Sequence, residues 1–84
     1  MERGIDFSSL LMMFFTTALI HLGEVPDPIA KEAKQDLEQA QRAIDILSVL
    51  EEKTKGNLSK EEEDLLQNLL YELRMKYLRV AKVL

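Results

Sequence analysis

The chain has 84 residues, no cysteine, 46% hydrophobic residues and a formal net charge of −4. This length favours one small domain spanning residues 1–84, and the lack of cysteine excludes a disulfide framework. The negative charge disfavours nucleic acid as a partner, because a phosphate backbone is itself anionic. A single histidine leaves few metal ligands, so we predict neither a metal nor another cofactor.

The first predicted element is an apolar helix over residues 7–22, FSSLLMMFFTTALIHL. Asp6 is placed to cap its N-terminus, and Gly23 suits the left-handed conformation that ends a helix. Sixteen helical residues extend about 24 Å, which is less than the roughly 30 Å hydrocarbon core of a membrane. The acidic leader and the lack of a small-residue cleavage site argue against a secretory signal. We therefore expect a buried helix of a cytoplasmic protein and disfavour membrane insertion.

This predicted helix is apolar on every side and contains no Asp, Glu, Lys or Arg. Such a helix needs neighbours all round, and two further helices of one chain are too few to surround it. We expect two or more copies to pack their first helices together, as a dimer or, in second place, a tetramer. The residues that we assign to this interface are Leu11, Met12, Phe15 and Leu19.

The second predicted helix ends at residue 55 and begins somewhere between residues 28 and 37. Asp27 followed by Pro28 can start a helix, and Asp36 with Gln39 offers a second start. From residue 37 onward, apolar residues cover about half of the helix circumference, as in a helix packed on one side. The basic residue Lys55 and the following Gly56 are typical of a helix C-terminus.

The third predicted helix spans residues 60–83. Ser59 and Glu62 have the spacing of a capping box, in which each side chain bonds the other residue's backbone N–H. One apolar stripe suits the core of the chain. A second stripe, at positions i, i+4 and i+7 on the far side, is assigned to an intersubunit interface and consists of Tyr71, Met75 and Leu78. The predicted fold is thus all-α, a three-helix bundle completed by homo-oligomerisation.

Candidate chemistry is sparse. His21 and Glu24 form an H-x-x-E pair, but Gly23 interrupts the helix between them, and we do not interpret the pair as a metal site. With one imidazole and no converging cations or nucleophile, the chain is predicted not to be an enzyme. The basic residues near the end of the third helix match the helix dipole better than an RNA contact.

Three pieces of the chain resemble one known family: DFSSLLMMFFTTALIHLGEVPDP, AIDILSVLEEKTKGNLS and EEEDLLQNLLYELRMKYL. They are similar to the small bacterial family catalogued as domain of unknown function 1844. The resemblance implies a small, all-helical bacterial protein with no established activity, so no catalytic residues can be carried over.

The leading functional hypothesis is a self-associating module for protein–protein interaction, with the polar loops around residues 21–24 and 53–57 available to an unknown protein partner. The alternative is a small-molecule or catalytic site at a subunit junction, made by His21, Glu24 and Arg74. A third hypothesis is a membrane-surface protein anchored by the first helix. It ranks last, because that helix lacks the charged face of an interfacial segment.

Overall fold

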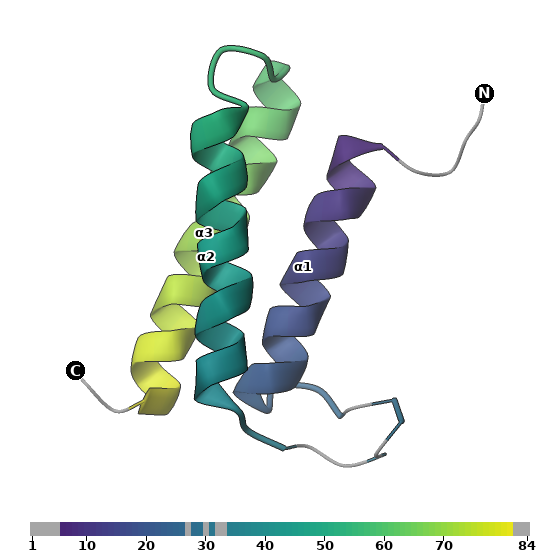
Figure 1. Ribbon diagram of the computed structural model, residues 1–84, viewed down its shortest axis with the longest axis vertical. Helices are drawn as coiled ribbons and strands as arrows, with labels where there is room; N and C mark the ends of the chain where they lie inside the picture. Colours follow the sequence, from purple (N-terminus) through teal and green to yellow (C-terminus); the bar gives the residue numbers. More distant parts are fainter. Residues whose placement is uncertain (1–5, 27, 30, 32–33, 82–84) are drawn as a thin grey trace.

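The computed structural model describes residues 6–26, 28–29, 31 and 34–81, whose helices are α1 (Phe7–Leu22), α2 (Leu37–Lys53) and α3 (Lys60–Ala81). Helices α2 and α3 form an antiparallel hairpin, and α1 packs against both of them (Figure 1). Among the described residues there is no strand. The prediction of an all-α fold built from three helices is confirmed.

Both ends of α1 form as predicted. The Asp6 carboxylate accepts a hydrogen bond of 2.9 Å from the Ser9 backbone N–H, which satisfies one of the free donors of the first turn. Gly23 has φ of 81°, and its N–H donates to the Ile20 carbonyl. The Glu24 N–H donates to the Leu19 carbonyl at 2.9 Å, which completes a Schellman ending.

Helix α2 uses the later of its two predicted starts. The Asp36 carboxylate accepts from the Gln39 N–H at 3.2 Å, while the Asp36 N–H donates to the His21 carbonyl at 2.7 Å. This second bond holds residue 36 beside the end of α1, and the helix begins directly after it. The start at residue 28 is wrong, because Pro28 lies in a turn; Asp27, its predicted cap, lies outside the described residues.

The C-terminus of α2 also differs from the prediction. The helix ends at Lys53, two residues before the predicted end at residue 55. Thr54 caps it: the Thr54 hydroxyl donates to the Leu50 carbonyl at 2.6 Å and the Thr54 N–H donates to the same carbonyl at 3.0 Å. Gly56 still has a left-handed φ of 84°, but it belongs to the connecting turn.

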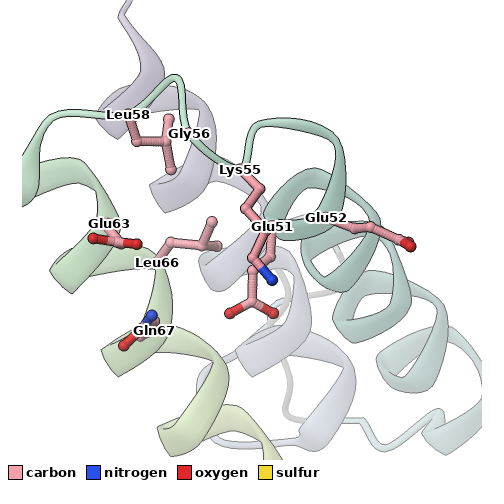
Figure 2. A pocket seen from close by; sticks show the side chains of 8 residues that line it. All are labelled: Glu51, Glu52, Lys55, Gly56, Leu58, Glu63, Leu66 and Gln67. Atoms are coloured by element: carbon pink, nitrogen blue, oxygen red, sulfur yellow. The ribbon is translucent and has the colours of Figure 1, made fainter.

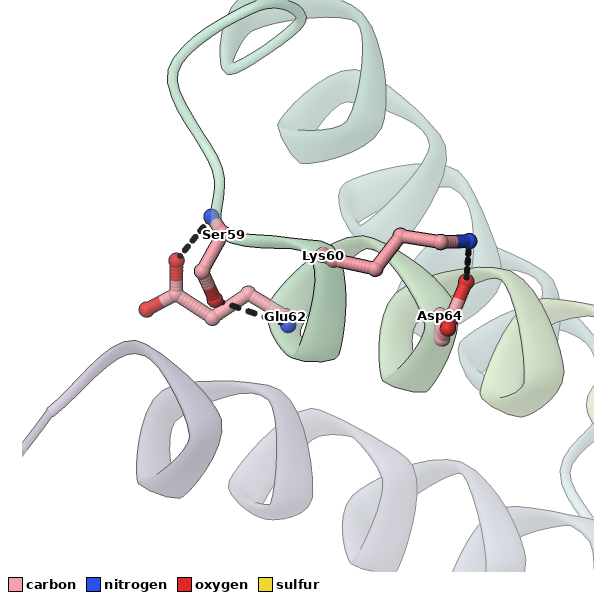
Figure 3. Close-up of polar contacts among 4 residues, drawn as sticks. All are labelled: Ser59, Lys60, Glu62 and Asp64. Carbon is pink, nitrogen blue, oxygen red and sulfur yellow. Dashed lines mark hydrogen bonds and ion pairs between the residues drawn. The ribbon is translucent and has the colours of Figure 1, made fainter.

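Helix α3 begins with the predicted capping box (Figure 3). The Ser59 N–H donates to the Glu62 carboxylate at 2.9 Å, and the Glu62 N–H donates to the Ser59 hydroxyl at 3.1 Å. A surface salt bridge then spans the first turn of the helix, with the Lys60 ammonium 2.8 Å from the Asp64 carboxylate. The helix is described to Ala81, so its predicted end at residue 83 lies outside the described residues.

The core lies between the three helices and, among the described residues, contains only apolar side chains. Helix α1 contributes one stripe with intervals of seven and four residues, so only one of its faces is buried by the chain itself. None of the described helices combines the length and the apolar character needed to cross a membrane. The buried residues are Leu11, Ala18, Leu22, Ala40, Ala43, Ile44, Leu47, Leu66, Leu69, Leu70 and Leu73.

Candidate functional site

The corner between α1 and α2 holds two of the predicted ligand-surface residues, His21 and Glu24. The hydrogen bond from the Asp36 N–H to the His21 carbonyl fixes the corner, and Gly23 lies so close to Gln35 that an added Cβ would be 2.9 Å from its Cγ. The Glu24 carboxylate lies 3.7 Å from the Lys76 ammonium, and both side chains are partly buried. Lys76 is therefore the α3 residue that faces this corner.

Arg74, the third predicted member of that surface, lies elsewhere. Arg74 and Lys76 are two residues apart on α3, so their side chains leave the helix about 160° from each other. The Arg74 guanidinium donates to the Ser48 hydroxyl on α2 at 2.8 Å. Among the described residues His21, Glu24 and Arg74 share no hydrogen bond or ion pair, so the structure does not bring the predicted site together.

Arg74 instead borders a groove of about 380 Å³ between α2 and α3, which we call the α2–α3 groove. No residue of α1 lines it. Its apolar part comes from both helices, and it has two charged side chains, Asp45 from α2 and Arg74 from α3, whose guanidinium reaches across to Ser48 of α2. The full lining is Gln41, Ile44, Asp45 and Ser48 from α2, with Arg74, Tyr77 and Leu78 from α3.

A second hollow, of about 330 Å³, lies beside the turn that joins α2 to α3 (Figure 2). Buried Leu66 lies at this hollow, and Glu51 and Glu63 supply carboxylates from the two helices. Figure 2 shows the Glu52 side chain pointing away from Glu63, so the three carboxylates do not converge. In the described part of the chain no group of three His, Asp or Glu residues could hold a metal ion.

The predicted interface residues of α1 divide between core and surface. Leu11 is fully buried inside the single chain and has no surface to offer a second copy, because it belongs to the stripe that packs on the other two helices. Phe15 and Leu19 are partly buried against the same core. Met12 is 43% exposed, and its neighbour Met13, which we did not predict, is 60% exposed.

The predicted stripe of α3 remains at the surface. Tyr71 is 67% exposed and Met75 41% exposed, while Leu78 is partly buried in the α2–α3 groove. Sequence reasoning missed two exposed apolar residues of α2, Ile46 and Val49, which border a shallow apolar depression. The exposure of Val49 could have been predicted, because it lies about 160–180° around the helix from buried Ala40 and Leu47. Ile46 is only about 100–120° from them, at the edge of the apolar half of the helix, so the pattern did not indicate its exposure.

Comparison with known proteins gives one match. The family model described as "Domain of unknown function (DUF1844)" matches residues 4–79. No curated protein matches the chain, and no solved structure matches it.

Proposed function

The chain belongs to the DUF1844 family of unknown function, and from its surface we propose that it is a self-associating module for protein–protein interaction. One observation carries the proposal. Helix α1 contains no Asp, Glu, Lys or Arg, yet the fold buries only one of its faces. Met12 and Met13 are left on the outside, 43% and 60% exposed.

The charge of the chain makes this face the natural place for a second copy. Two chains of net charge −4 repel each other in general, but the outer face of α1 has no charge to desolvate or repel. Its neighbouring residues Thr16 and Thr17 are small and neutral. Burying methionine side chains here removes apolar area from water, at roughly 25 cal/mol per Å².

The test is sedimentation velocity on the wild-type chain and on Met13→Glu. A carboxylate on the outer face of α1 would have to be buried unpaired in the interface, so we expect the variant to sediment as a smaller species. Gln39→Glu is the matched control, because it adds the same charge at an exposed position of α2 outside both the outer face of α1 and the apolar stripe of α3. Wild-type behaviour in both variants would contradict the proposal.

The alternative of a small-molecule or catalytic site receives no support from a specific contact. Glu24 is paired with Lys76, and Arg74 lies on the other side of α3. A membrane-surface role is tested by flotation of the protein with anionic liposomes, where we expect none to float. A cytoplasmic location in a bacterium belongs to the same proposal, and fractionation of cells expressing the tagged chain tests it.

A further inference from the structure

The α2–α3 groove lies apart from the outer face of α1 and is partly apolar. Ile44 is buried, while Tyr77 and Leu78 are partly exposed. Tyr71 precedes Leu78 by seven residues, two helical turns, so it continues the same row along α3. Its 67% exposure shows that apolar surface continues along α3 beyond the groove, on the far side of Arg74.

The groove carries one acidic and one basic side chain, which lie at nearly the same height along the helix axes. Asp45 accepts from the Gln41 side-chain amide at 2.8 Å, and Arg74 donates to Ser48 at 2.8 Å. Ser48 follows Asp45 by three residues, so the Arg74 head group is held within about 4.5 Å of the level of Asp45 along the helix axis. Among the described residues, neither charge forms an ion pair within the chain.

We propose that the α2–α3 groove receives the same groove of a second copy, related by a two-fold axis parallel to the helices. Rotation about such an axis leaves the height of each residue along the helices unchanged and exchanges the α2 side of the groove with its α3 side. It therefore places α2 of each chain over α3 of the partner subunit. Each Arg74 then exchanges its hydrogen bond to Ser48 of its own chain for an ion pair with Asp45 of the partner subunit, so one contact supplies two ion pairs.

Charge complementarity argues for a second copy as the occupant. A two-fold interface must be complementary to itself, and the groove meets this condition by presenting one acid and one base at matching levels. The paired hairpins form a four-helix bundle in which every adjacent pair of helices is antiparallel, a common arrangement for helices of this length. No residue of α1 lines the groove, so α1 can stay packed on the opposite side.

This inference goes beyond the proposed function, which depends on the outer face of α1. The experiment uses two charge reversals in the full chain, Arg74→Glu and Asp45→Lys. Each variant alone sets like charges opposite each other twice. We expect each to lose the largest species seen for the wild type in sedimentation velocity, with an apparent dissociation constant raised about tenfold or more.

Mixing the two variants is the decisive step. In the mixed pair Lys at position 45 faces Glu at position 74, and the native Arg74 faces the native Asp45, so both contacts are attractive again. We expect the mixture to recover the largest species and to associate at least about tenfold more tightly than either variant alone. Circular dichroism checks that each variant keeps its helices, which we expect because both residues are exposed.

Arg79→Glu is the matched control, since it makes the same charge change on the same helix about 140° away from Arg74 and outside the groove lining. It should assemble as the wild type does. If the two reversals also assemble as the wild type, or if mixing restores nothing, the groove is not an interface. In that case a loss of association in Met13→Glu would still support the proposed function.

Discussion

At the scale of single residues, each end of α1 depends on one position, and the two positions need different properties. Asp6 supplies an acceptor to backbone donors, and Gly23 supplies a conformation that other residues adopt only with strain. Both were predictable from the sequence, because a cap involves only residues within one turn. The Glu24–Lys76 pair was not predictable, because it joins segments 52 residues apart.

The cap at Asp6 makes a small part of the stability depend on pH. Hydrogen bonds from the Ser9 backbone N–H and the Ser9 hydroxyl lower the pKa of Asp6 below its ordinary value of 3.8. A carboxylate with a lowered pKa in the folded state stabilises the fold fully above the unfolded-state pKa. That contribution is lost as the pH falls through the folded-state pKa.

We therefore expect wild type to melt at a higher temperature than Asp6→Asn at neutral pH, since asparagine can cap but has no charge for the helix dipole. The difference should shrink as the pH falls below about 3.8. Thermal unfolding of both proteins at several pH values measures it. A difference that stays constant down to the acid limit would contradict this role of the charge.

Gly23 has both a left-handed φ and a close neighbour, whereas Gly56 has only the left-handed φ. Comparing substitutions at the two positions therefore separates the cost of the backbone conformation from the cost of the close contact. Gly23→Ala should cost about 1–2 kcal/mol from its φ, with an added cost because the new Cβ would lie 2.9 Å from Gln35 Cγ. Gly56→Ala has a similar φ but no atom within 4 Å of the new Cβ, so it should cost less. Urea unfolding compares the two, and equal losses would show that the Gln35 contact is unimportant.

At the scale of elements, the sequence was sufficient to predict that all three elements are helices. It was also sufficient to predict where α1 and α3 begin, because each has a strong N-terminal cap. It was ambiguous at α2, because residues 29–35 include several good helix formers; the bond from the Asp36 N–H to the His21 carbonyl that fixes the start is a tertiary contact. It also could not tell which face of α1 turns inward. That helix is apolar all round, so its periodicity has no preferred direction.

The placement of Leu11 and Met12 gives a test at this scale. Leu11→Ala should lower the free energy of unfolding by about 2–5 kcal/mol, because it leaves a cavity in the core of one chain. Met12→Ala should change it by no more than about 1 kcal/mol under conditions where the chain is monomeric, since Met12 is 43% exposed and lies outside the buried core. Urea unfolding at low protein concentration measures both, and a larger loss in Met12→Ala would reverse the inferred orientation of α1.

At the scale of the whole molecule, apolar side chains remain exposed on all three helices. The three described helices are too few to cover one another on every side. We propose two separate contacts with further copies, one at the outer face of α1 and one at the α2–α3 groove. When both are two-fold contacts, they can close into a tetramer, and either one alone gives a dimer.

Sedimentation velocity of the wild-type chain, from low micromolar concentration to about a hundredfold higher, tests the central claim most directly. We predict a dimer or tetramer whose population rises with concentration, because exposed apolar area is removed from water only by association. A stably folded monomer at every concentration would contradict both self-contacts and the function built on them.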